Sequence, residues 1–91
     1  MIRCQTKGDD VRVTFSLPQD APSGPVSVVG DFNDWTPGIH PLVKRAKGTR
    51  SVVLTVPKGS TITFRYLGDN DYWFDDEDAD EQTPDGCIVR V

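Results

Sequence analysis

The chain has 91 residues, a formal net charge of −4, and 36% apolar against 26% charged residues. A chain of this length builds one modest hydrophobic core, which excludes a two-lobed enzyme with a cleft between domains. We therefore expect a single domain over residues 1–91. No apolar run exceeds three residues, too few for a membrane span or the core of a signal peptide.

The negative charge is concentrated in one segment. Residues 69–81 contain eight acidic residues and no basic one, and the other 78 residues contain six acids and ten bases. The sequence therefore predicts a mildly basic body with one solvated acidic loop, and the charge of that loop repels anionic partners only locally. The basic cluster at residues 44–50 has no interleaved aromatic residues, so we expect neither a nucleic-acid partner nor a membrane partner.

Apolar and polar residues alternate with a period of two along most of the chain. The alternation covers residues 11–17, 51–56, 61–66 and 87–91, and a further β-branched run lies at residues 25–30. Turn-forming residues separate these runs at short intervals, and no window has helical spacing. Seven to eight short strands of this kind predict an all-β fold, an antiparallel β-sandwich.

Two aromatic residues lie three apart in a segment whose other residues favour turns. Gly30 permits a sharp turn, and Asp31 and Asn33 favour local side-chain-to-backbone hydrogen bonds. We expect Phe32 to close the end of the core. Trp35 has two open interpretations: a partly buried residue covering a sheet edge, or an exposed platform on which the apolar face of a sugar ring stacks.

A second aromatic group follows a predicted hairpin turn. Arg65 alternates with Phe64 and Tyr66, so it is expected to project outward, and the turn at 68–71 returns the chain to Trp73. Trp73 can therefore lie near Arg65, either in the core or as part of the platform. A sugar site combines apolar contact area with a few polar groups, and these residue types supply both.

These segments resemble one known family. The segments 30–35 (Gly-Asp-Phe-Asn-Asp-Trp), 64–67 (Phe-Arg-Tyr-Leu) and 73–76 (Trp-Phe-Asp-Asp) resemble the isoamylase N-terminal, or early set, domains. This family includes the glycogen-binding domain of the AMP-activated kinase β subunit. The resemblance covers roughly residues 10–91 and implies an immunoglobulin-like sandwich that binds α-glucans without catalysis.

The resemblance also implies roles for individual residues. Trp35 and Trp73 match the stacking tryptophans of glycogen-binding members, and Arg65 matches their basic residue. The segment 83–87 is short and lacks the asparagine usual in that loop, so weak glucan binding is expected. The alternative is a protein-interaction module that uses the acidic loop 69–81 or a sheet edge.

Catalytic, metal and cofactor sites find little support in the sequence. His40 is the only histidine and has no nucleophile partner recognisable by motif. The acidic run at 76–80 resembles the start of a calcium loop, but Glu81 replaces the required glycine and Cys87 the final glutamate. Cys4 and Cys87 are 83 residues apart, without the spacing of a metal site. We expect no enzyme activity, no cofactor, and two reduced cysteines in a cytoplasmic protein.

Overall fold

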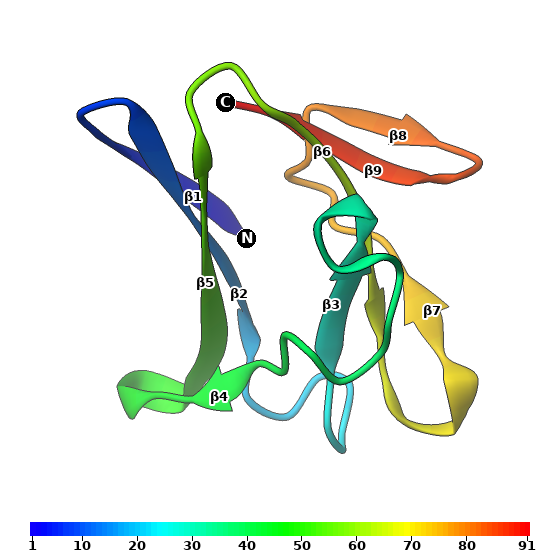
Figure 1. Ribbon diagram of the computed structural model, residues 1–91. Helices are drawn as coiled ribbons and strands as arrows, with labels where there is room; N and C mark the ends of the chain where they lie inside the picture. Colours follow the sequence, from blue (N-terminus) through cyan, green and yellow to red (C-terminus); the bar gives the residue numbers. More distant parts are fainter.

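The computed structural model describes residues 1–91 and contains two antiparallel sheets that face each other (Figure 1). The first sheet has the strand order β1 (Ile2–Lys7), β2 (Asp10–Pro18), β5 (Thr49–Pro57) and β4 (Val43–Lys44). The second has the order β3 (Ser27–Gly30), β6 (Thr61–Leu67), β9 (Gly86–Arg90) and β8 (Glu81–Thr83), and β7 (Trp73–Phe74) also pairs with β6. Three single-turn helices lie in the connections: η1 (Asp31–Asn33), η2 (Ala46–Gly48) and η3 (Asp69–Asp71). None of them has the length or the apolar content needed to cross a membrane.

The predicted antiparallel β-sandwich is confirmed. The order β1-β2-β5-β4 opposite β3-β6-β9 corresponds to the ABED and CFG sheets of immunoglobulin-type sandwiches. The structure has nine strands where the sequence predicts seven to eight. Three strands lie outside the runs that the alternation identifies: β4 and β8 contain only two and three residues, and β1 has no buried residue.

The core lies between the two sheets and is built from the inward side of the predicted alternation. Phe15 of β2 meets Phe64 and Tyr66 of β6, with ring centroids 4.8 Å and 6.4 Å away. Valines from both sheets, Ile62 and Cys87 complete the buried cluster. Burying each large side chain contributes about 1.5–3 kcal/mol, so this contact between β2 and β6 holds the two layers together.

The acidic segment is solvated at seven of its eight acids, as its composition predicts, but it is not a plain loop and its eighth acid is buried. It contains η3 and β7 and enters β8, and Asp76 within it is only 6% exposed. The Asp76 carboxylate accepts hydrogen bonds from the Tyr66 hydroxyl (2.6 Å), the Asp78 amide (2.9 Å) and the Met1 ammonium (3.0 Å). A carboxylate can be buried when several donors replace its water, so this acid anchors the segment to the core.

The two cysteines are both free. Cys4 is exposed on β1, whereas Cys87 is buried on β9 and its sulfur accepts a hydrogen bond from the Asp76 amide at 3.2 Å. Burial raises the pKa of Cys87 to about 11, although that hydrogen bond partly opposes the shift. Cys87 therefore remains a neutral thiol and packs as a small apolar residue.

Candidate functional site

Trp35 lies in a loop that begins where β3 ends, and the geometry of Gly30 decides how that loop starts. A Cβ atom on Gly30 would lie 2.4 Å from the Thr63 carbonyl oxygen of β6, so only glycine fits. The loop then turns through η1, where the Asp31 carboxylate accepts a hydrogen bond from the Thr63 amide at 3.3 Å. The first turn of the loop is therefore pressed against β6.

Asn33 fixes the remainder of the loop. Its side-chain oxygen accepts a hydrogen bond from the Gly30 amide (3.1 Å), and its NH2 group donates to the Val28 carbonyl (3.0 Å). The same NH2 group lies 3.0 Å from Nδ1 of His40. His40 therefore helps to hold the loop, and Phe32 packs partly buried against Phe15, as the sequence predicts.

The backbone of Trp35 has an uncommon conformation. Its φ of 56° lies in the left-handed region, directly after Asp34 with φ 54°. Such a conformation costs a bulky residue on the order of 1–3 kcal/mol and persists only when its surroundings enforce it. The Trp35 amide donates to the Gly30 carbonyl at 2.9 Å, and the side chain is 40% exposed. The loop thus holds a half-exposed indole in a strained but fixed position.

Trp73 is placed by the pairing of β6 with β7. Tyr66 pairs with Phe74, and their rings meet in the core at 5.1 Å. Leu67 pairs with Trp73, and because side chains alternate along a strand, both point to the outer face of the sheet. Trp73 is 43% exposed there, so its indole lies on the surface rather than in the core.

Arg65 projects from the same outer face of β6, and the segment before β9 determines its position. Its Nη2 donates to the Pro84 carbonyl at 2.7 Å, and its Nε lies 3.4 Å from the Asp75 carboxylate without a hydrogen-bond acceptor. Gly86, with φ 140°, brings the start of β9 close to the stem of Arg65. The sequence reasoning missed these contacts with Asp75 and Pro84, because a backbone acceptor 19 residues away leaves no local pattern.

Two of the three predicted residues, Arg65 and Trp73, lie on the paired strands β6 and β7, and Trp35 lies in the loop that follows β3 of the same sheet. Arg65 lies two residues before Leu67, the partner of Trp73, and Gly30, which holds the Trp35 loop, pairs with Phe64. The loop after η1 runs along β3 toward β4 (Figure 1), with the His40 carbonyl accepting from the Val28 amide at 2.9 Å.

A shallow hollow of about 210 Å³ lies at the end of the β3–β6 pair, lined in part by Ser27, Gly38, Pro41 and Leu67. None of the three predicted residues lines this hollow. The arrangement is therefore an open surface rather than a walled cleft, and an open surface suits contact with one side of a ligand.

Asp76, the buried carboxylate beside this surface, has a pKa below its usual value. Burial alone would raise the pKa of Asp76, but the Tyr66 hydroxyl, the Asp78 amide and the Met1 ammonium together lower it. Burial, together with the hydrogen bond that the Tyr66 hydroxyl donates to Asp76, raises the pKa of Tyr66. Asp76 is thus a permanently ionised structural group at neutral pH.

Comparison with known proteins gives a distant relationship. No protein-family model matches the chain. The amylopullulanase of Thermoanaerobacter thermohydrosulfuricus is 32% identical over 60 residues, which is 62% of this chain and 4% of that protein. The chain therefore spans only a small fraction of the curated relative it matches. The similarity relates it distantly to part of a starch-active enzyme.

Proposed function

We propose that this protein is a non-catalytic binding module for α-glucans such as glycogen, starch or maltodextrin. The observation that carries the proposal is the presence of two half-exposed tryptophans, Trp35 and Trp73, on segments that flank the outward-pointing Arg65. Indole rings offer flat apolar area at a small entropic cost, and sugar rings present a matching C–H face. The distant similarity to an amylopullulanase supports a carbohydrate ligand.

Arg65 supplies the polar part of the proposed contact. A guanidinium has five N–H donors, and here one Nη2 hydrogen is used by the Pro84 carbonyl while Nε faces Asp75. The remaining donors are free for sugar hydroxyls, and the two protein contacts reduce the entropy lost when Arg65 binds. An open surface with few polar partners gives weak affinity, with Kd on the order of 0.1–1 mM.

The absence of catalysis is part of the proposal. A glycosidase needs a carboxylic acid whose pKa is raised by a walled cleft. The buried carboxyl next to the surface, Asp76, has its pKa shifted downward instead. Seven of the eight acids at residues 69–81 are exposed to solvent. These features support binding without bond cleavage.

The experiment is an NMR titration of the isotope-labelled protein with maltoheptaose, using amide shifts as the readout. Shifts should cluster around Trp35, Arg65 and Trp73, and Trp35→Ala or Trp73→Ala should weaken binding at least about tenfold, or about 1.4 kcal/mol. Tyr72→Ala is the matched control, because Tyr72 is exposed next to Trp73 but stacks on Phe74 instead. An absence of shifts up to about 10 mM sugar, which is far above the expected Kd, would contradict the proposal.

A protein-interaction function has one specific observation in its favour, the exposure of seven acids within residues 69–81. A basic partner would gain from this local charge, and its binding should weaken with salt. Affinity capture from the producing cells with the wild type and with a Asp71→Asn, Glu77→Gln, Asp78→Asn triple variant distinguishes the two functions. If a partner is no longer captured by the variant and is also released at high salt, this second function is favoured. If the same amount is captured by the variant and at high salt, this function is contradicted.

A further inference from the structure

The two layers of the sandwich carry opposite charges. Residues 1–20 and 43–58, which form the β1-β2-β5-β4 sheet and its turns, contain eight bases and three acids, a balance of +5. The remaining residues, which form the other layer, contain two bases and eleven acids, a balance of −9. An anionic ligand is therefore repelled from the tryptophan-bearing sheet and attracted to the opposite one.

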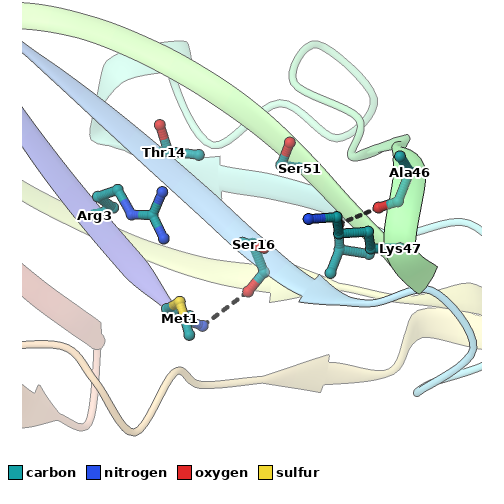
Figure 2. A pocket seen from close by; sticks show the side chains of 8 residues that line it. Met1, Arg3, Thr14, Ser16, Ala46, Lys47 and Ser51 are labelled. Carbon is teal, nitrogen blue, oxygen red and sulfur yellow. Dashed lines mark hydrogen bonds between the residues drawn. The ribbon is translucent and has the colours of Figure 1, made fainter.

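The largest hollow of the molecule, about 510 Å³, lies on the outer face of this basic sheet. Polar side chains line most of it, namely Arg3, Thr14, Ser16, Lys47, Thr49 and Ser51 (Figure 2). Its floor is formed by small hydroxyl side chains, because Ser16 pairs directly with Ser51 across β2 and β5. Short side chains between longer ones create the depression.

Two cations border the hydroxyls from opposite sides. Arg3 comes from β1 and pairs with Thr14, and Lys47 comes from η2 beyond β4 (Figure 2). Neither side chain forms a salt bridge in the structure, since the four ion pairs involve Met1, Arg65 and Arg90. Arg45 adds a third positive charge, because its Nε donates to the Ser51 hydroxyl at 3.1 Å. Their charges are thus available to a ligand.

Arg50 belongs to the same basic run in the sequence but has another role. Its guanidinium is buried and donates to the Gly24 carbonyl (2.7 Å) and the Pro22 carbonyl (2.6 Å). It therefore holds the loop before β3 and contributes no contact to the hollow. The residues that line the hollow and remain for recognition are Arg3, Lys47 and the hydroxyl side chains between them, with Arg45 adjacent to the hollow at Ser51.

We propose that this hollow is a second binding site, which takes the phosphate monoester of a sugar. Guanidinium and ammonium groups with adjacent hydroxyls match the oxygens of a phosphate, and the hydroxyls also match those of the sugar. The lining contains no aromatic side chain, which argues against a nucleobase, and the only apolar residues in it are Met1 and Ala46. The volume lies within the range of small-molecule sites.

The phosphate ester has two possible sources, a free sugar phosphate and an ester carried on a glucan chain. Both present the same chemistry to Arg3 and Lys47. The site lies on the opposite sheet from Trp35 and Trp73, so the inference does not rest on the proposed glucan binding. The two proposals can fail independently, because different variants abolish the two kinds of binding.

The test is an amide-shift titration with glucose 6-phosphate, glucose, inorganic phosphate and 6-phosphorylated maltoheptaose. We expect glucose 6-phosphate to bind with Kd on the order of 1 mM and glucose not to shift the residues of the hollow. Arg3→Gln and Lys47→Gln should each weaken binding about fivefold, because each removes one charge-assisted contact at an exposed site. Arg12→Gln is the matched control, with the same charge change on the same sheet outside the hollow.

The outcomes decide between specific and diffuse recognition. The site is supported if Arg3→Gln and Lys47→Gln weaken the binding of glucose 6-phosphate. The control Arg12→Gln and the double variant Trp35→Ala, Trp73→Ala should leave this binding intact. Shifts with the phosphorylated maltoheptaose alone support it and assign the ester to a glucan chain. Three results would overturn the proposed site. The first is equal weakening by all three charge variants, and the second is inorganic phosphate binding as tightly as glucose 6-phosphate. The third is an absence of shifts with either phosphorylated sugar at about 20 mM.

Discussion

The buried carboxylate of Asp76 should contribute more to stability than any other acid of its segment. In Asp76→Asn one carboxylate oxygen becomes an NH2 group, so the Tyr66 hydroxyl and the Met1 ammonium, which both donate to Oδ2, lose that acceptor. Hydrogen bonds to charged groups are worth about 1.5–3 kcal/mol against about 1 kcal/mol for neutral ones. With side-chain rearrangement, we expect the free energy of unfolding to fall by about 2–3 kcal/mol.

The assay is urea unfolding at neutral pH together with thermal unfolding, where this loss should lower Tm by about 8–24 °C for a chain of this size. Asp78→Asn is the control, because the Asp78 side chain is exposed and lies 3.8 Å from the Met1 ammonium. It should change the free energy of unfolding by less than about 0.5 kcal/mol. An Asp76→Asn protein as stable as the wild type would show that the carboxylate does not anchor this segment.

The pH dependence of the same difference gives an independent check. The folded state lowers the pKa of Asp76 from its unfolded value of 3.8, so its contribution is complete above that value. The contribution disappears as the pH falls through the lower folded pKa. The stability gap between wild type and Asp76→Asn should therefore be constant near neutral pH and should narrow below about pH 4. A gap that stays constant down to about pH 2.5 would contradict this assignment.

Three further predictions follow from contacts in the core and the loops. Gly30→Ala should lower the free energy of unfolding by about 2–4 kcal/mol in urea unfolding, because its methyl group would meet the Thr63 carbonyl oxygen; an unchanged midpoint would contradict the contact. Arg50→Lys should cost about 1–3 kcal/mol in the same assay, since an ammonium cannot donate to both loop carbonyls in the geometry of the fork. A thiol reagent at pH 8 should label one thiol in the native protein and two in urea, because Cys87 is buried with a pKa of about 11. Cys4→Ser should abolish the labelling of the native protein. Native labelling of both would show that the core opens.

The sheets could be predicted where a strand is long enough to repeat its pattern. The alternation of Val11, Val13 and Phe15 identifies the buried face of β2, because one face of a half-buried strand must be apolar. A two-residue strand such as β4 carries no period, and its existence depends on the partner strand β5. The alternation therefore identifies the strands that have a buried face, and it leaves out the short β4 and β8 and also β1, which has six residues but no buried one.

Some features of the candidate site could likewise be predicted from the sequence, and others could not. The outward direction of Arg65 follows from its own strand, but its contacts with Asp75 and the Pro84 carbonyl come from distant segments. Asp76 looks like one acid among eight in the sequence, and only the fold places the Tyr66 hydroxyl beside it. A run of acidic residues shows only the local composition of the sequence. Whether one of these acids is buried depends on tertiary contacts with distant residues, which the neighbouring sequence does not show.

The left-handed backbone at Trp35 has a consequence for how variants of this protein will behave. Glycine would adopt φ near 56° without this cost, but it would also give up the buried part of the indole, since Trp35 is only 40% exposed, and it would leave the unfolded chain freer. The contacts of the Trp35 side chain therefore offset the strain of its own backbone. A substitution at this position changes the packing of the loop and the exposed ring together, so a loss of ligand contact there has to be compared with the loss of stability in the same variant.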